Sequence, residues 1–530
     1  MEKDIRRTFI NPIVIPDYPV LSGKKREMAP DADFEAMRNP GLAWGRGGKK
    51  MIDIETLMAE DGHAYDVNIG EIMNFAYGKA GRNDVRATAD PSAYYFNGKW
   101  YLYITSGAVY ESDDLVNWTV HHDESWMPIS APMAPTVEEY HGKYYGAANN
   151  TPLFVSDNPI GPWTLLGDWT LPDGREFVAG DVMIFRDDDD RLYLYFGLGP
   201  CIMGAELDPE QPNKLLTQPK VLIPFNKENY WERFGACNEN WGIGFIEGSW
   251  MVKHGDKYYL VYSCSGTEYY AYAMGAYTSD SPLGPFLPQA KNPVSRNRDK
   301  GLCKGGGHGS LVKGPEDTLW IFYTIPVCVD ATMERRIGMD AAGFDEDGNL
   351  FALTGCDVPQ WYPGVMQRPE KGNATELVTL TIFKPTLTSS YVDGHYPMYA
   401  IDEALHTWWQ PEADDQEPML AVNLQGSFHV SAFRVMWKDI GMDLQAGICG
   451  GAYQYVIETS TDAKEWKTVV DFSHNQIDLS VAYHPIDTVL ANFVRIRILG
   501  APEGITPGLL NFTAFGESRD KTNIQFKTKE

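Results

Sequence analysis

The sequence predicts an all-β protein, built as a five-bladed β-propeller followed by a β-sandwich. Three observations predict this fold: a composition rich in aromatic residues, glycine and proline, a strand unit that recurs along the chain, and a change of pattern after about residue 370. The 530 residues include 15 Trp, 29 Tyr, 50 Gly and 34 Pro, a mixture typical of many short strands joined by turns. At roughly 150 residues per domain, this length predicts more than one domain.

One strand unit recurs five times, each copy consisting of a turn of Gly, Asp or Asn with a charged residue and then an aromatic-rich strand. The copies are NGKWYLYIT from Asn97, HGKYYGAAN from His141, DDRLYLYFG from Asp189, GDKYYLVYS from Gly255 and EDTLWIFYT from Glu316. In a second signature, a strand ends in Ser-Asp and a turn delivers an aromatic residue. It follows three of the copies, as ESDDLVNW from Glu111, VSDNPIGPW from Val155 and TSDSPLGPF from Thr278.

The size of the repeat indicates what it builds. A unit of roughly 45 to 65 residues made of short strands and hairpin turns matches a propeller blade with insertions. Five copies therefore predict five blades. A β-sandwich, the alternative, also contains aromatic strands, but it does not explain the paired signatures.

The blade signature stops after a stretch from Gln360 to Glu376 that is rich in proline, glycine and charge, as a domain boundary often is. Beyond it, strands such as YQYVIETS from Tyr453 and NFVRIRILG from Asn492 alternate polar and apolar residues. We therefore expect a propeller with an N-terminal extension over residues 1–370 and an independent sandwich over residues 371–530, which is a normal single-domain length.

Charge and composition exclude several classes of function. The chain has 45 Lys and Arg against 72 Asp and Glu, a formal net charge of −27, which repels nucleic-acid phosphates and anionic lipid surfaces. No apolar run reaches the length of a membrane span, and the seven cysteines include no Cys-x-x-Cys pair that would suggest a zinc site. The first twenty residues do not resemble a signal peptide. A cytoplasmic protein is expected as the sequence stands, and a periplasmic or secreted one if a leader has been removed.

Three carboxylates lie at matching places, just ahead of the recurring turn. Asp90 comes seven residues before the first turn, Asp181 eight before the third and Glu247 eight before the fourth. Residues that begin the innermost strands of a propeller point into its central channel, so we expect the three carboxylates to face one axis. Each one alone would be explained as an exposed turn residue or a cap, but three in register favour a site.

Such a set of carboxylates is what glycoside hydrolysis needs. One carboxylic acid protonates the leaving oxygen, and a second carboxylate activates water or attacks the sugar. A third acid nearby raises the pKa of the proton donor, because like charges a few ångström apart disfavour ionisation.

Two further features point to the same channel. In KGGGHGSLVKG, glycines 305 to 307 let the backbone approach its neighbours closely, and His308 begins the fifth blade where other blades carry acids. Arg335 and Arg336, in MERRIGMD, are candidates to bring a guanidinium group into the channel. A structural turn is the alternative for His308, and surface pairing explains the arginines equally well.

In their order and spacing, these motifs resemble glycoside hydrolase family 43. The matching pieces are DPSAYYFNGKWYLYITS, SDDLVNW, APTVEEYHGKYYGAA, VSDNPIGPW, GDVMIFRDDDDRLYLYFG, EGSWMVKHGDKYYLVYS and GGGHGSLVK, which span roughly residues 85 to 350. The resemblance implies a five-bladed propeller and an inverting, exo-acting enzyme, chiefly an arabinofuranosidase or a xylosidase. It further implies that Asp90 is the general base, Glu247 the general acid and Asp181 the acid that raises the pKa of Glu247 and orients it.

The resemblance also assigns the basic residues. His308 matches the family's channel histidine, which in several members helps to hold a central calcium ion or water. An arginine of the last blade often pairs with the third acid, and Arg335 or Arg336 is expected in that role. No cofactor is expected to be required, and a structural calcium ion bound through water at His308 is the metal that the resemblance implies.

Two positions depart from the family pattern. The usual Trp-Ala-Pro-Asp of the second blade reads Met-Ala-Pro-Thr and ends at Thr136, and the usual Glu-Gly-Pro reads Glu-Gly-Ser from Glu247. Both border the sugar site, so Thr136 is expected to contact the substrate, and the departures bear on which sugar is bound more than on the reaction. An unusual stretch from Gly23 to Arg86 is a candidate cover for the pocket.

The C-terminal segment resembles a coagulation factor 5/8 type C (discoidin-like) domain, and the resemblance implies that the β-sandwich is a galactose-binding-like jelly roll. The matching pieces are SSYVDGHYPMYAIDEALHTWWQP from Ser389, YVIETSTDAKEW from Tyr455 and NFVRIRILG from Asn492. Such domains often act as carbohydrate-binding modules, and many are structural buttresses packed on a catalytic domain. Trp408 and Trp409 fit a core as well as a binding platform.

The sequence therefore predicts an exo-acting, inverting glycoside hydrolase that removes terminal pentose or furanose residues from plant polysaccharide side chains or oligosaccharides. An α-L-arabinofuranosidase is expected first, with a β-D-xylosidase or a β-D-galactofuranosidase as alternatives. The expected partner is an oligo- or polysaccharide, with no nucleic acid and no membrane span. A non-catalytic carbohydrate-binding protein is the alternative of a different class, and the presence of all three carboxylates disfavours it.

Overall fold

The computed structural model describes residues 4–16, 86, 88–105, 108–121, 133–242, 244–296, 301–327, 334–365, 371–443 and 446–518, and the structural statements below concern these residues. Their regular structure consists of strands and four short 3-10 turns, at Ile5–Arg7, Tyr230–Glu232, Pro315–Asp317 and Pro397–Ala400. The all-β class is as predicted. Within the described ranges, no helix has the length and apolar character needed to cross a membrane. Of the stretch from Gly23 to Arg86, only Arg86 lies among the described residues.

Four sheets of the described chain are antiparallel meanders, in which each strand pairs with the next one in the sequence. The first contains β2 (Ser92–Phe96), β3 (Lys99–Tyr103), β4 (Val109–Ser112) and β5 (Trp118–His121). The second contains β6 (Thr136–Tyr140), β7 (Lys143–Ala147), β8 (Leu153–Ser156) and β9 (Thr164–Gly167). Another contains β18 (Ile246–His254), β19 (Lys257–Cys264), β20 (Ala273–Ser279) and β21 (Leu287–Pro288), with β14 (Leu198–Gly199) beside β18. The last contains β22 (Gly307–Lys313), β23 (Leu319–Pro326), β24 (Arg335–Phe344) and β25 (Leu350–Ala352).

A larger, seven-stranded sheet lies between the second and third meanders in chain order. Its strand order is β11-β10-β16-β15-β13-β12, and β17 also pairs with β15. The strands are β10 (Trp169–Thr170), β11 (Glu176–Phe177), β12 (Met183–Arg186), β13 (Leu192–Phe196), β15 (Cys201–Asp208), β16 (Gln211–Leu215) and β17 (Lys220–Pro224). The prediction of five alike blades is therefore corrected: among the described residues there are four regular blades, and DDRLYLYFG lies in this larger sheet. The physical reason is the length of β15, which pairs with β17 over its first half and with β16 at its end.

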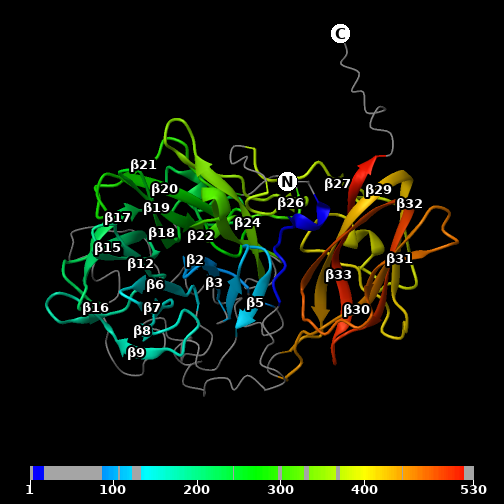
Figure 1. Ribbon diagram of the computed structural model, residues 1–530, viewed down its shortest axis with the longest axis horizontal. Helices are drawn as coiled ribbons and strands as arrows, with labels where there is room; N and C mark the ends of the chain where they lie inside the picture. The colour runs from blue at the N-terminus through cyan, green and yellow to red at the C-terminus, as the bar shows by residue number, and fades with distance from the viewer. Residues whose placement is uncertain are drawn as a thin grey trace, which may run out of the picture.

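The inner strands of these sheets contact one another as a ring. In order they are β2, β6, β12, β18 and β22, and β22 returns to β2. The arrangement is propeller-like and forms the blue-to-green part of Figure 1. Strand β3 shows why the aromatic repeat folds this way: Trp100 and Leu102 pack into one core cluster, while Tyr101 and Tyr103 pack into another. Because side chains alternate along a strand, an aromatic strand can fill the cores on both faces of its blade.

The C-terminal part is one seven-stranded sheet of order β27-β33-β29-β32-β30-β31, with β28 also paired to β29. Its strands are β27 (Val378–Thr379), β28 (Thr386–Thr388), β29 (Met419–Ile440), β30 (Gln454–Ser460), β31 (Lys467–Phe472), β32 (Val481–Gly500) and β33 (Thr506–Ser518). The pairing of β29 with β32 shifts register twice, between Asn423 and Phe428 and between Val430 and Ala432. Such irregularities bend strands. A core that includes the fully buried Trp409 packs within this part, so Trp409 is a core residue and not a binding platform.

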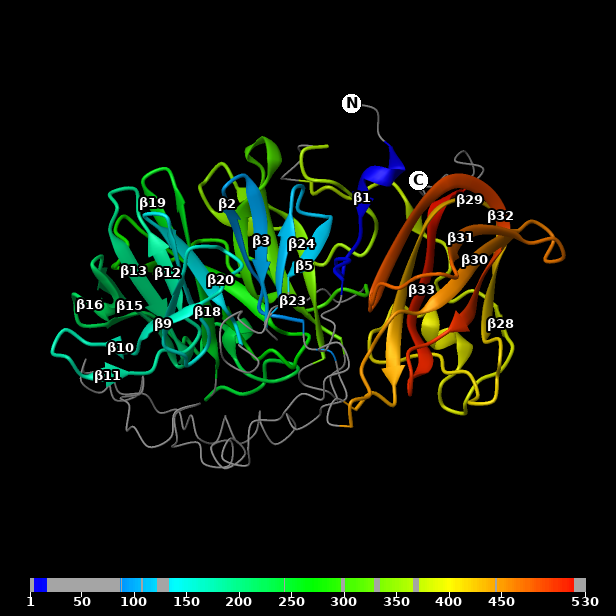
Figure 2. The same ribbon diagram turned by 60° about the horizontal axis from the view of Figure 1, so that its bottom comes forward.

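The C-terminal part packs directly on the propeller. Strand β1 (Thr8–Phe9) pairs with β26 (Gln360–Trp361) and lies between the two parts in Figures 1 and 2. A cluster of the propeller's aromatic core also contains residues of the C-terminal part, namely Leu405, Met436, Val481 and Leu510. Trp408 packs against the same cluster and stacks on His395, with ring centroids 4.3 Å apart. This tryptophan therefore belongs to the contact between the two parts.

Candidate active site

Three of the candidate site residues share an uncommon backbone conformation at the beginnings of inner strands. The φ angle is 51° at Asp90, 44° at Asp181 and 35° at His308, and all three side chains are buried. A left-handed conformation at a residue other than glycine costs about 1–3 kcal/mol and persists only where the surroundings enforce it. Strain of this kind gathers at functional sites, and these three residues occupy equivalent places in different sheets.

Asp90 precedes β2 and is held by hydrogen bonds on both carboxylate oxygens. The hydroxyl of Thr105 donates to Oδ2 at 2.5 Å, and Nη1 of Arg335 donates to Oδ1 at 3.0 Å. Its backbone N–H donates to Oγ1 of Thr324 at 2.9 Å. Burial would raise the pKa of Asp90, but the charge of Arg335, with His308 and the hydrogen bonds, holds that pKa below its ordinary value. Asp90 is therefore ionised at neutral pH.

Glu247 lies in β18, where the hydroxyl of Tyr272 donates to its Oε1 at 2.5 Å. The pKa of Glu247 is raised to about 7, chiefly by burial and also by the nearby charges of Asp90 and Glu268, while the hydrogen bond from Tyr272 opposes the rise. Glu247 can therefore carry a proton near neutral pH, unlike Asp90.

Asp181 precedes β12, and its backbone N–H donates to Oδ1 of Asn149 at 3.3 Å. Burial raises the pKa of this carboxyl well above its ordinary value, and the charges of Glu247 and Asp90 add to the rise. Asp181 and Glu247 therefore titrate as a pair, in which ionisation of one disfavours ionisation of the other.

His308 lies beside the carboxylates, as predicted from the glycine-rich segment. Its Nδ1 is 3.5 Å from Oδ1 of Asp90 and 3.8 Å from Oδ2 of Asp181. Burial lowers the pKa of the imidazole, which is therefore neutral at pH 7. The preceding glycines are needed for close packing, because a Cβ on Gly307 would overlap the ring of Tyr272.

The structure separates the two candidate arginines. Nη1 of Arg335 donates to Asp90 and also to Oγ1 of Thr267 at 2.9 Å. Its Nε and Nη2 are buried and have no hydrogen-bond partner among the described residues. Arg336 instead donates from Nη1 to the backbone oxygens of Arg86 and Arg335. Neighbours in a strand point to opposite faces, so only Arg335 is brought to the carboxylates, with two donors directed at no protein acceptor in the described chain.

Thr136 begins β6, but its hydroxyl is already engaged. Its Oγ1 donates to the backbone oxygen of Val182 at 2.8 Å. Val182 directly follows Asp181, so this bond ties the second sheet to the segment that carries Asp181. The described geometry thus gives Thr136 a supporting contact at the site.

Several residues that sequence reasoning missed make hydrogen bonds to the site residues or their neighbours, and they share one position in the repeat. They are the ninth residues of the repeat copies: Thr105, Asn149, Gly197, Ser263 and Thr324. Thr105 and Thr324 hydrogen-bond Asp90, Asn149 accepts from Asp181, and Ser263 accepts the backbone N–H of His308 at 2.7 Å. The N–H of Gly197 donates to the carbonyl of Gly180, next to Asp181. The glycine or small polar residue at the end of each copy was therefore a readable signal.

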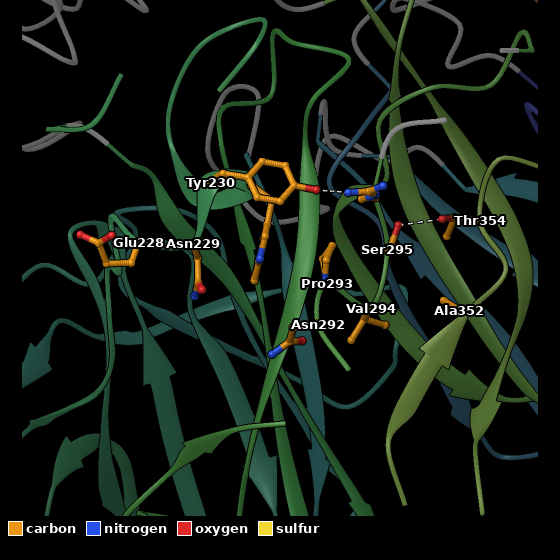
Figure 3. Close-up of a pocket in the computed structure, with 11 residues that line it drawn as sticks. Glu228, Asn229, Tyr230, Asn292, Pro293, Val294, Ser295, Ala352 and Thr354 are labelled. Carbon is orange, nitrogen blue, oxygen red and sulfur yellow. Dashed lines mark hydrogen bonds between the residues drawn. The ribbon is translucent and has the colours of Figure 1, made fainter. Parts of the chain in front are cut away.

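A surface pocket of about 780 Å³ lies next to the glycine-rich segment, between the loops before β18 and β22. Figure 3 shows Tyr230 at its rim and the hydrogen bond of 2.9 Å between Ser295 and Thr354 in its wall. Oγ of Ser295 also donates to the backbone oxygen of Gly306 at 2.9 Å. The wall of this pocket therefore fixes the backbone just before His308, whereas the three carboxylates lie elsewhere.

Asp181, Glu247 and His308 also form a group whose ligand atoms lie within 4.8 Å of one another. Calcium prefers six to eight oxygen ligands. This group offers two carboxyl groups with raised pKa values and one imidazole nitrogen. Such a donor set does not fit a calcium site by itself, so we derive no step through a metal ion.

The arrangement can carry out acid–base chemistry. A buried site holds an ionised carboxylate, Asp90, beside a carboxyl group, Glu247, that keeps its proton near neutral pH. Two carboxyl groups whose environments push their pKa values apart are suited to act as a general base and a general acid. Arg335, buried beside Asp90, holds that carboxylate in its ionised form.

Comparisons with known proteins find matches to both parts of the chain. The model of the family described as glycosyl hydrolases family 43 matches residues 82–350, and that of the NedA-like, galactose-binding domain matches residues 399–496. A β-D-galactofuranosidase of Aspergillus niger is 28% identical over 300 residues, covering 50% of this chain and 82% of that protein. A non-reducing end α-L-arabinofuranosidase of Bacteroides ovatus is 25% identical over 264 residues, covering 44% of each chain. A β-xylosidase of Xylanibacter ruminicola is 28% identical over 261 residues, covering 38% of this chain and 78% of that protein.

Proposed function

The chain belongs to glycosyl hydrolases family 43, and on that premise we propose that it is an exo-acting, inverting enzyme that removes terminal pentose or furanose residues. The substrate we propose first is α-L-arabinofuranose on side chains of plant polysaccharides or on their oligosaccharides. One observation carries the proposal: Asp90 and Glu247 share a buried site whose contacts lower the pKa of Asp90 and raise that of Glu247 to about 7.

The mechanism that we propose is a single displacement. Glu247 donates its proton to the glycosidic oxygen as the bond from that oxygen to the anomeric carbon breaks. Asp90 takes a proton from a water molecule, whose oxygen bonds the anomeric carbon from the opposite face, so the configuration inverts. In this proposal Asp181 helps to orient Glu247, whose pKa is kept high by burial and by the charges of Asp90 and Glu268. Arg335 keeps Asp90 ionised. Burial of the group excludes bulk water from the reacting atoms.

The relatives named above act on three different sugars, so the choice of sugar is the finer part of the proposal. A β-D-xylosidase or a β-D-galactofuranosidase would use the same acid and base. A non-catalytic carbohydrate-binding protein would not need a strained, ionised Asp90 beside a protonated Glu247, and those two states favour the enzyme.

The test is hydrolysis of aryl α-L-arabinofuranoside, β-D-xylopyranoside and β-D-galactofuranoside, with the anomer of the first product followed by proton NMR. We expect the arabinofuranoside to be the best substrate and the sugar to be released with inverted configuration. Preference for another glycoside would replace the proposed sugar, and a product of retained configuration would refute the inverting mechanism. Binding of sugar without turnover of any glycoside or of an arabinose-bearing oligosaccharide would favour the binding protein.

Removal of metal ions is expected to leave the activity unchanged, because the acid, the base and the guanidinium group that serves them all belong to this chain. The measurement is kcat/KM after dialysis against EDTA, compared with the same preparation supplied again with Ca²⁺. Loss of most of the activity on dialysis, with recovery on adding calcium, would show that Asp181, Glu247 and His308 serve a metal ion after all.

A further inference from the structure

Asp439, near the end of β29, is hydrogen-bonded to Arg86, in the segment that leads to Asp90. Its buried carboxylate accepts two hydrogen bonds from Arg86, from Nε at 2.6 Å and from Nη2 at 3.2 Å. The hydroxyl of Tyr453 donates to the same carboxylate at 2.7 Å, and Nη1 of Arg86 donates to Asp478 at 3.0 Å. A guanidinium group bound in this two-pronged way is fixed in direction as well as in position. The C-terminal part thus holds the chain four residues before Asp90.

Lys438, the neighbour of Asp439, forms an ion pair with the segment that carries Arg335. Its Nζ lies 2.9 Å from Oε2 of Glu334, which is buried and directly precedes Arg335. Adjacent residues of one strand of the C-terminal part therefore reach two segments of the propeller that are far apart in the sequence.

The segment that leads to Asp90 and the segment that carries Arg335 are also hydrogen-bonded to each other. The backbone N–H of Arg335 donates to the backbone oxygen of Arg86 at 3.3 Å, and the hydroxyl of Thr88 donates to the backbone oxygen of Arg335 at 3.0 Å. Just beyond these bonds, Nη1 of Arg335 meets Oδ1 of Asp90 at 3.0 Å. A displacement of either segment would therefore change the contact between Arg335 and Asp90.

A third buried contact joins the same two parts without touching these segments. Arg434, also in β29, is fully buried and donates from Nη1 to the backbone oxygens of Asn11 at 3.2 Å and Asp357 at 3.0 Å. Neither of these residues lies in the segments that carry Asp90 and Arg335. Arg434 also pairs with the buried Glu403 within the C-terminal part at 2.5 Å. It therefore offers a control for stability and docking that makes none of the contacts of Lys438 and Asp439.

We propose that Lys438 and Asp439 are positioning residues for the reaction, and that the C-terminal part sets the contact between Asp90 and Arg335. The inference rests on the proposed function, in which Asp90 is the base. It gives the C-terminal part a role in catalysis that needs no sugar bound to that part. A misplacement of about 1 Å at reacting groups can lower a rate about 10²-fold. Even a small movement on loss of the contacts of Lys438 or Asp439 therefore has a measurable effect on kcat.

The experiment compares Asp439→Asn, Lys438→Met and the control Arg434→Met, assayed well below the melting temperature of each variant. We expect kcat to fall about 10- to 100-fold in Asp439→Asn, with a smaller change in KM, because the base acts in the transition state. Lys438→Met should show the same split, and Asp439→Glu should recover part of the rate because it keeps the carboxylate. Arg434→Met should lower the melting temperature and leave kcat unchanged.

A crystal structure of Asp439→Asn gives a readout that needs no turnover. We expect Nη1 of Arg335 to move beyond hydrogen-bond distance of Oδ1 of Asp90, from the present 3.0 Å. An unchanged contact, or equal loss of kcat in Arg434→Met, would overturn the proposal. An inactive wild type would count against the proposed function alone, since the crystal structure still decides whether the contacts of Asp439 position Asp90 and Arg335.

Discussion

Replacing Asp90 by alanine is expected to lower kcat on an aryl α-L-arabinofuranoside about 10³- to 10⁴-fold, the upper range for loss of a general base. The physical reason is that Asp90 is the ionised member of the cluster, held so by Arg335 and by the hydroxyl of Thr105. The carboxyl groups that remain in the cluster, Asp181 and Glu247, both have raised pKa values and are poorly suited to take the proton from water. The measurement is steady-state kinetics at pH 6, where Asp90 is charged and Glu247 keeps its proton.

Two additions make this result specific. The control is Asp113→Ala, which removes an exposed carboxylate near β4 and should retain full activity. Azide, a nucleophile that needs no base, should restore turnover of Asp90→Ala and form a glycosyl azide of inverted configuration. The assignment of Asp90 would be wrong if the variant kept more than a tenth of the wild-type kcat.

The candidate site could be predicted from the sequence to the extent that it depends on the repeat. Asp90, Asp181 and Glu247 were found by counting back from equivalent turns, and the structure brings all three together with His308. The choice between Arg335 and Arg336 could not be made, because adjacent residues of a strand point to opposite faces and the sequence does not say which faces the channel.

Two other features lay outside what a local pattern can show. The repeat marks the strand next to the innermost one in each sheet, so the pairing of β15 with both β16 and β17, which enlarges one sheet, left no periodic trace. The bond between Arg86 and Asp439 joins residues 353 positions apart. A lone arginine and a lone aspartate at that separation carry no signal, although together they connect the C-terminal part to the segment that bears Asp90.

Replacing Glu247 by glutamine should give a loss that depends on the leaving group. A glycosidic oxygen of a natural oligosaccharide needs a proton to leave, so we expect kcat/KM to fall about 10³-fold on such a substrate. A dinitrophenolate leaves without a proton, so the loss on a dinitrophenyl glycoside should be less than about tenfold. Glutamine keeps the shape of the side chain and its contact with Tyr272, so the comparison isolates the proton.

The pH profile supplies the second half of this prediction. Glu247 must be protonated and its pKa is raised to about 7, so wild-type kcat/KM should fall as the pH rises through about 7. Asp90 must be ionised and its pKa is lowered, so the acidic fall should come only below the ordinary range for an aspartate near 3.8. In Glu247→Gln, measured on the dinitrophenyl glycoside, the fall above pH 7 should disappear while the acidic fall stays. Persistence of the alkaline fall in that variant would assign it to another group, and Asp181, whose pKa is raised by burial and by Glu247, would then be the candidate acid.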